Sequence, residues 1–198
     1  MSVFPLGLRL QGRLCVVFGA GEEQAARAKT WHALGAKVRV VAATLAEELQ
    51  PLVLQGAIEH LPRGYMQGDL AEAWLAVLVD SNSELATRIF EEAERERVFF
   101  CAVDQPQSSY SHLAQARAGD LVIAISTNGR VPALGRRLRQ ELERLLVSSD
   151  AESHVARLAK LRDSTRSAER RRVLGEAVSQ VRFSGELSFG EPGEGEDQ

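Results

Sequence analysis

Short apolar runs, each ended by glycine or polar residues, recur along most of the chain. The clearest, Leu14–Phe18, is β-branched in its middle and apolar on both faces, which is typical of a parallel strand buried between helices. Stretches rich in helix-forming residues separate these runs, so the pattern predicts an α/β protein. We expect strands at 14–18, 37–41, 57–61, 74–79, 98–103 and 120–125.

Helices are expected between and after the strands. The polar residues 80–83 precede a helix over 84–97, and capping explains them as well as ligand contact does. Pro132 suits the first turn of a helix over 133–147, because proline lacks an N–H there. An apolar stripe of that helix, which indicates core packing by default or a dimer seam, consists of Leu134, Leu138, Leu142 and Leu145. Further helices are expected over 22–34, 45–54 and, in two pieces, 151–181, whereas 4–10 alternates like an edge segment.

The turn after the first strand is a candidate nucleotide site. Gly19-Ala20-Gly21 separates the strand from a helix, and Gly35 followed by 37–41 completes a βαβ unit. Such a turn directs free helix N–H groups at an anion, typically a dinucleotide pyrophosphate. Gln24 stands where a third glycine or alanine is usual. A glycine turn in an α/β protein that binds no nucleotide remains the alternative.

The end of the second strand has neither of the usual ribose ligands. Ala42-Ala43-Thr44 offers no acid for the adenosine ribose hydroxyls and no arginine for a 2′-phosphate. Ribose recognition would therefore depend on backbone groups and the Thr44 hydroxyl.

Asp104 is the carboxylate most suggestive of chemistry. It follows the strand at 98–103, where open α/β sheets bind ligands, and apolar neighbours could raise its pKa and let it accept a proton. The ordinary alternative is a turn aspartate before Pro106. Nearby His112 could assist Asp104, although a surface or packing histidine is the simpler interpretation.

A hydroxyl-rich loop at 126–132 leads into the helix over 133–147. The arginines at the start of this helix would attract a ligand that bears several carboxylates or phosphates. The alternative is that part of this cluster is solvated or paired with Glu141 and Glu143. The cluster consists of Arg130, Arg136, Arg137 and Arg139.

Composition bounds the class of protein. The chain has 198 residues and a formal net charge of -3, which gives no case for a nucleic-acid partner. No apolar run approaches the ~20 residues that cross a bilayer, and the N-terminus lacks a signal-peptide pattern, so we expect a cytoplasmic protein with no membrane partner. Cys15 and Cys101 lie in predicted strands and suggest neither a metal site nor a disulfide.

The order of motifs resembles one family. The segments FPLGLRLQGRLCVVFGAG, WLAVLVDSN, VDQP, GDLVIAISTNGRVPALGRRLRQELE and ERRRVL are similar, at matching spacing over residues 3–182, to the precorrin-2 dehydrogenase and sirohydrochlorin ferrochelatase family. This module also forms the N-terminal half of siroheme synthases. The resemblance implies a Rossmann-like parallel sheet, a homodimer, and NAD-dependent oxidation of the tetrapyrrole precorrin-2 to sirohydrochlorin. In bifunctional members it also implies insertion of ferrous iron, a lyase activity.

The resemblance also implies roles for individual residues. Asp104 matches the family's essential aspartate, and no residue is assigned to a metal. The residues expected to bind NAD are Gly19, Gly21, Glu22, Glu23, Ala43, Thr44 and Asp80. Those expected to bind the tetrapyrrole are Ser126, Thr127, Asn128, Arg130 and Arg136.

Four parts of the chain follow from this interpretation. We expect an NAD-binding domain over 1–113, a dimerisation and substrate segment over 114–147, a helical domain over 148–183, and a disordered acidic tail over 184–198. Two alternatives to the enzyme remain open. One is a tetrapyrrole-binding chelatase or carrier that has lost NAD-dependent activity, and the other is a dinucleotide-sensing dimer without chemistry.

Overall fold

The computed structural model describes residues 3–184, 187 and 188, which form two compact units divided after Leu113. The finer division of the second unit at 147/148 stays a prediction, and most of the predicted acidic tail lies outside the described residues. Within the described part of the chain, no helix is both long and apolar enough to cross a membrane.

The first unit is built on a parallel five-stranded sheet in the order β3-β2-β1-β4-β5. The strands are β1 (Leu14–Phe18), β2 (Lys37–Val41), β3 (Ile58–Leu61), β4 (Ala73–Leu78) and β5 (Phe99–Ala102). The chain proceeds outward from β1 to β3, then crosses to β4 on the other side of β1. The strand order therefore reverses between β1 and β4, as in Rossmann-like folds, which bind ligands at the carboxyl ends of the strands where the order reverses, so the predicted fold class is confirmed.

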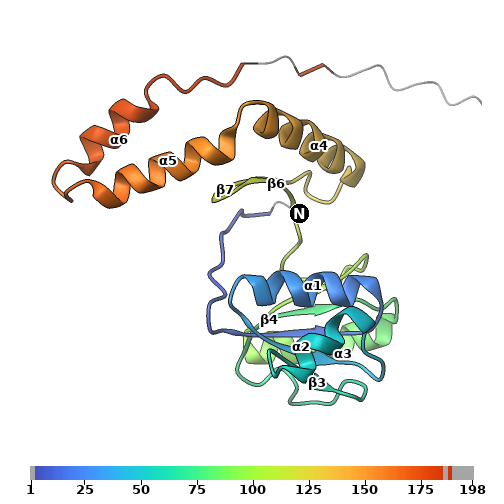
Figure 1. Ribbon diagram of the computed structural model, residues 1–198. Coiled ribbons are helices and arrows are strands. Elements are labelled where there is room, and N and C mark those ends of the chain that lie inside the picture. The colour runs from blue at the N-terminus through green and yellow to red at the C-terminus, as the bar shows by residue number, and fades with distance from the viewer. Residues whose placement is uncertain (1–2, 185–186, 189–198) are drawn as a thin grey trace, which may run out of the picture. The chain divides into compact units, whose positions relative to one another are not determined.

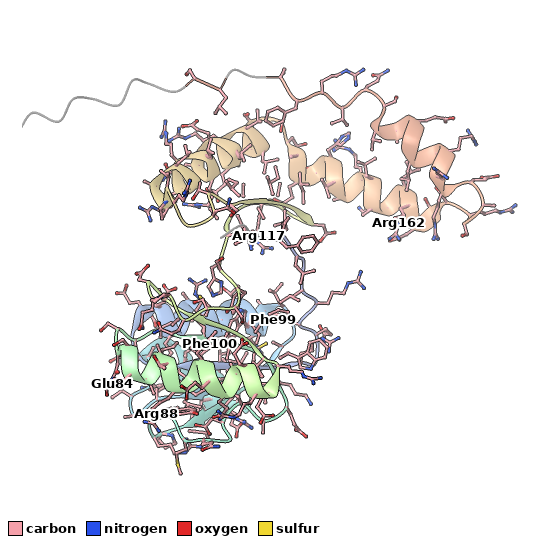
Figure 2. The ribbon with its side chains drawn as sticks, turned by 180° about the vertical axis from the view of Figure 1, so that it is seen from behind. Glu84, Arg88, Phe99, Phe100, Arg117 and Arg162 are labelled. Carbon is pink, nitrogen blue, oxygen red and sulfur yellow. The ribbon has the colours of Figure 1, made fainter. Side chains whose placement is uncertain are left out.

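Helices cover both faces of this sheet. The alternation of side chains along β1 sends Val17 toward α1 (Glu22–Ala33) and Val16 and Phe18 toward α3 (Ser83–Glu96). Figure 2 labels Phe99 and Phe100, neighbours on β5 that show the same alternation, since Phe100 is fully buried and Phe99 is exposed. Two apolar clusters, one on each face, therefore hold the glycine turn and the strand ends in place.

In its described residues the second unit combines a β-hairpin with three successive helices, of which the first packs on the hairpin (Figure 1). The hairpin pairs β6 (Ala114–Ala118) with β7 (Leu121–Ile125) in antiparallel register. The helices are α4 (Pro132–Ser148), α5 (Ala151–Ser164) and α6 (Arg170–Val178). The helix α4 packs against the hairpin at the buried Gly135, where a Cβ would make only an ordinary contact with the Cβ of Ala114 at 3.8 Å.

Four sequence predictions need correction. The strand expected at 120–125 belongs to the separate hairpin, and its partner β6 was not predicted. The segment 4–10 forms no strand. The helix expected over 45–54 is a 3-10 turn, η1 (Glu47–Leu49), followed by α2 (Gln50–Leu54), because Pro51 begins a helix more readily than it continues one. On α4 the leucine that is buried is Leu146, outside the predicted stripe.

Candidate active site

The glycine turn between β1 and α1 has two glycines with different constraints. At Gly19 (φ 97°) a Cβ would lie 3.0 Å from the carbonyl oxygen of Val79, so the turn packs tightly against the end of β4. At Gly21 (φ 92°, ψ -167°) a Cβ would meet nothing within 4 Å, but only glycine adopts this conformation readily. The turn is therefore closed toward the sheet and open toward solvent beside the helix start.

The start of α1 leaves its first N–H groups available. The helix begins at Glu22, and Gly21 at its N-cap has no side chain to accept from them. Glu22 is exposed, whereas Glu23 pairs with Arg27 one turn further along the helix, where the Arg27 Nη2 lies 2.5 Å from the Glu23 Oε1. Beside the turn, the carboxylate of Glu22 is therefore in contact with solvent, and that of Glu23 is paired with a cation.

Gln24 is completely buried and does not obstruct the turn. Its Nε2 donates to the carbonyl oxygen of Gly19 and, at 3.4 Å, to that of Thr44. Its Oε1 accepts from the amide of Ala46 at 2.9 Å. The residue that departs from the usual fingerprint thus connects the turn to the loop after β2, where Ala43 and Thr44 have exposed side chains.

The loop after β4 is ordered by its own polar residues. Asn82 caps α3 by accepting from the amide of Leu85 at 3.0 Å, which confirms the predicted capping. Asp80 is exposed, and its Oδ1 accepts from the amide of Asn82 at 2.8 Å. Gln105, which sequence reasoning did not single out, donates from Nε2 to the Asp80 carbonyl oxygen at 2.6 Å. This bond ties the loop after β4 to the loop after β5.

Asp104 lies in the loop that follows β5 and has a left-handed backbone (φ 57°). Its side chain is exposed, so the apolar surroundings expected from the sequence are absent within this unit. The chain turns at Asp104 and returns along β5, where the amide of Ser109 donates to the carbonyl oxygen of Phe100 at 2.8 Å. A carboxylate presented at the carboxyl edge of the sheet is thereby held on a short, bonded loop.

A buried polar group that the sequence did not reveal lies beneath this loop. Tyr110 Oη is 3.3 Å from the Ala76 carbonyl oxygen and 3.2 Å from Nε2 of His112. Burial lowers the pKa of His112 to about 4, aided by the charge of Arg27, and raises the pKa of Tyr110 well above its ordinary value. Both side chains are therefore uncharged near neutral pH, which agrees with a packing role for His112.

Cys101 belongs to the same buried region. Burial raises the pKa of its thiol and outweighs the hydrogen bond with Ser108 and the charge of Arg27, which act in the other direction. The thiol therefore stays protonated near neutral pH. The sequence did not predict that Cys101, Tyr110 and His112 lie together, because no local pattern shows which loop residues fold back onto a strand.

The loop at 126–130 and the start of α4 belong to the second unit. Ser126 Oγ accepts from the amide of Asn128 at 3.0 Å, and Thr127 Oγ1 accepts from the amide of Val131 at 3.3 Å. Both hydroxyl protons remain able to donate to a ligand. Ser126, Asn128 and Arg130 are exposed, and Thr127 is half-buried.

The arginine cluster on α4 divides into two pairs. Arg137 and Arg139 form i,i+4 ion pairs with Glu141 and Glu143, as the alternative interpretation held. Arg130 and Arg136 are exposed and form no ion pair with any residue in the described part of the chain. These two cations, together with the helix N-terminus, remain able to attract an anion.

A hollow of about 620 Å³ lies at the opposite, amino-terminal edge of the sheet. Several of its lining residues contact one another, since Arg13 stacks 3.2 Å from the ring centroid of Trp74 and Arg39 pairs with Glu59 at 2.7 Å. No predicted site residue lines it. Among the residues that the structure places, no group of three or more His, Cys, Asp or Glu side chains could hold a metal ion.

Comparison with known proteins places this geometry in a family. A family model described as putative NAD(P)-binding matches residues 6–115, which include the whole parallel sheet and its glycine turn. The chain belongs to this putative NAD(P)-binding family. A second model, the sirohaem biosynthesis protein central region, matches residues 119–145 of the same chain. The family assignment thus supports NAD as the cofactor expected from the sequence.

Relatives of this NAD(P)-binding family member are siroheme synthases. Siroheme synthase 1 of Yersinia enterocolitica is 32% identical over 202 residues, covering all of this chain and 43% of the relative. The siroheme synthase of Chromobacterium violaceum is 33% identical over 173 residues, covering 87% and 36%. The chain therefore spans about two-fifths of the length of these relatives.

A solved structure shares the fold. SirC, a precorrin-2 dehydrogenase, is 22% identical and superposes with a TM-score of 0.75 over 90% of each chain. The expected resemblance to the precorrin-2 dehydrogenase and siroheme synthase group is confirmed.

Proposed function

We propose that this chain catalyses the NAD-dependent dehydrogenation of precorrin-2 to sirohydrochlorin in siroheme biosynthesis. One observation carries the proposal: likeness to a siroheme synthase extends over the whole chain. Fold likeness to a precorrin-2 dehydrogenase, over nine-tenths of both chains, agrees with it. The open glycine turn at the start of α1 supports it physically, because helix N–H groups bind anions.

The residues of the turn fit a dinucleotide. The open space beside Gly21 allows a pyrophosphate to approach the backbone at the start of α1. In this proposal Gly19, Gly21, Glu22 and Glu23 border the pyrophosphate, Ala43 and Thr44 border the adenosine ribose, and Asp80 lies at the carboxyl end of β4. When bound, NAD accepts a hydride from the substrate.

The chain's own side chains would bind the substrate and take up a proton. Dehydrogenation removes a hydride and a proton from the macrocycle, and the exposed carboxylate of Asp104 is the proposed proton acceptor. Carboxylates of the tetrapyrrole would be bound by the two unpaired arginines and the loop hydroxyls. This proposed substrate set is Ser126, Thr127, Asn128, Arg130 and Arg136.

The second unit supports a homodimer. Its apolar cluster contains only three buried residues among those described, Ala116, Ala118 and Leu146. The leucines and valines of α5 and α6 are at most half-buried, and the hairpin has two strands only. A two-stranded sheet with so small a core is marginal by itself, so we propose that a second copy covers it. A cytoplasmic location would keep Cys15 and Cys101 reduced.

The test is the reaction itself. Purified protein with precorrin-2 and NAD should produce the absorbance of sirohydrochlorin and of NADH together, and omission of NAD should abolish both. Glu91→Gln, an exposed acid on α3, is the matched control for Asp104→Asn. Absence of product with the unaltered protein, in the presence of both reactants, would overturn the proposal.

Two additions separate the alternatives. Ferrous iron added after oxidation tests the chelatase step, which predicts loss of the sirohydrochlorin spectrum faster than without protein. Separate titrations with NAD and sirohydrochlorin test the carrier, which predicts tetrapyrrole binding without NAD binding. Buried Gln24 and paired Glu23 give no steric or electrostatic reason to expect loss of NAD binding.

A further inference from the structure

The Gln24 side chain links two loops that border the proposed dinucleotide site. Its two N–H groups and its oxygen all have partners, which are Gly19, Thr44 and Ala46. An amide side chain has two donors and one acceptor oxygen, so both ends of this buried group are satisfied. Since the side chain is fully buried, these bonds are shielded from competition with water.

The two loops leave neighbouring parallel strands. Gly19 follows β1, and the segment 43–46 follows β2, whose register pairs Phe18 with Val41. Where the strands end, a long backbone hydrogen bond runs from the amide of Gly19 to the carbonyl oxygen of Val41 at 3.4 Å. Gln24 reaches past this point to Thr44 and Ala46, the latter at the N-cap of η1. Its bonds therefore hold the second loop relative to the first.

We propose that Gln24 is a positioning residue that sets the spacing between the pyrophosphate site at the turn and the adenosine-ribose site at 43–46. The inference rests on the proposed NAD-dependent function. In this inference the chain needs no acidic residue after β2 to bind the adenosine ribose, because Gln24 holds the backbone of the loop in the ribose-binding conformation before the ligand arrives. A loop ordered before binding costs less to order on binding, which favours a ligand that contacts both loops.

The inference predicts a difference between ligands. Gln24→Met keeps the length of the side chain and removes all three hydrogen bonds. We expect its Kd for NAD and for ADP-ribose, which span both loops, to rise about tenfold, or about 1.4 kcal/mol. Inorganic pyrophosphate contacts the turn alone, so its Kd should change less than twofold. Calorimetry measures the first two, and competition or NMR titration measures the third.

Two further measurements distinguish positioning from a general loss of stability. The amide of Ala46 should exchange with solvent faster in Gln24→Met, because its acceptor is gone. Gln24→Glu should bind ADP-ribose weakly near neutral pH and regain affinity as pH falls. Its carboxylate repels the two carbonyl oxygens, whereas its protonated form can donate to one of them. Val38→Ala, at a buried position near the amino end of β2, is the matched control and should bind all three ligands normally.

The outcomes separate this inference from the proposed function. Unaltered NAD and ADP-ribose binding in a folded Gln24→Met protein overturns the inference and leaves the dehydrogenase intact. Equal losses for Gln24→Met and Val38→Ala, or for pyrophosphate and ADP-ribose, also overturn it. Failure of the unaltered protein to bind NAD refutes both.

Discussion

The backbone at Asp104 allows its carboxylate to be tested without disturbing the loop. Its φ of 57° lies in the left-handed region, which aspartate, asparagine and glycine tolerate and alanine does not. Replacement by alanine therefore mixes loss of the carboxylate with backbone strain of about 1 kcal/mol. Asp104→Asn removes only the charge and the proton-accepting ability, and Asp104→Gly removes the side chain while relaxing the backbone.

These three variants should differ in stability and agree in activity. We expect kcat to fall by roughly 10²- to 10⁴-fold in all three, the usual contribution of a general base. The midpoint of thermal unfolding should stay unchanged in Asp104→Asn and fall by roughly 4–8 °C in Asp104→Ala if the 113-residue unit unfolds independently. NAD affinity, measured by calorimetry, should be unchanged in Asp104→Asn.

The assay is sirohydrochlorin formation at saturating NAD and substrate, so that kcat and not KM is compared. Retention of more than a tenth of the wild-type kcat by Asp104→Asn would refute Asp104 as the proton acceptor. Activity that is lost in Asp104→Ala alone would show that the residue shapes the turn, which is the ordinary interpretation of an aspartate before Pro106.

Three other predictions concern stability, pH and substrate binding. Glu92→Leu should lower the free energy of unfolding, measured in urea, by about 3 kcal/mol or more, because the buried Glu92 carboxylate accepts hydrogen bonds from three donors that would lose their partner. The control Glu91→Leu, at the exposed neighbouring position, should change this free energy by no more than about 0.5 kcal/mol. Equal effects of the two substitutions would contradict the burial of Glu92. Since the pKa of His112 falls from 6.5 to about 4 on folding, the unfolded chain binds more protons than the folded chain between these two pH values. The free energy of unfolding should therefore decrease as pH falls from 6.5 toward 4 and level off below. His112→Gln should flatten this pH dependence in urea titrations, and an unchanged slope would count against the pKa shift. Arg136→Gln should raise KM for the tetrapyrrole roughly fivefold, which is the scale of an exposed ion pair. Arg144→Gln, on the same helix but at an arginine paired with Glu141, should leave KM unchanged. Identical KM values for the two variants would remove Arg136 from the proposed substrate-binding residues.

The order of elements in the first unit could be predicted because local patterns carry it. The two-sided apolar run Leu14–Phe18 coincides with β1, the strand expected at 37–41 coincides with β2, and the glycine turn lies where expected. Buried parallel strands need apolar residues on both faces, which leaves a signal that no tertiary contact is required to interpret. The cap at Asn82 is local in the same way.

The hairpin strand β6 was missed because its signal is not local. The sequence Ala114–Ala118 alternates alanine with polar residues and has little β-propensity. It becomes a strand by pairing with β7 and packing beneath α4, where Ala116 is fully buried. Small side chains suit that close packing, but their smallness gives no prior indication of it.

The Rossmann-like unit, the turn and the position of Asp104 at the end of a strand could be predicted from the sequence alone. The hydrogen bond from Ala46 to Gln24, across 22 residues of chain, and the exposure of Asp104 became known only from the folded structure. Periodicity tells which side of an element faces the core, because that depends on neighbours in sequence. It cannot tell which polar atoms of distant loops meet, because that depends on how the strands are ordered in the sheet.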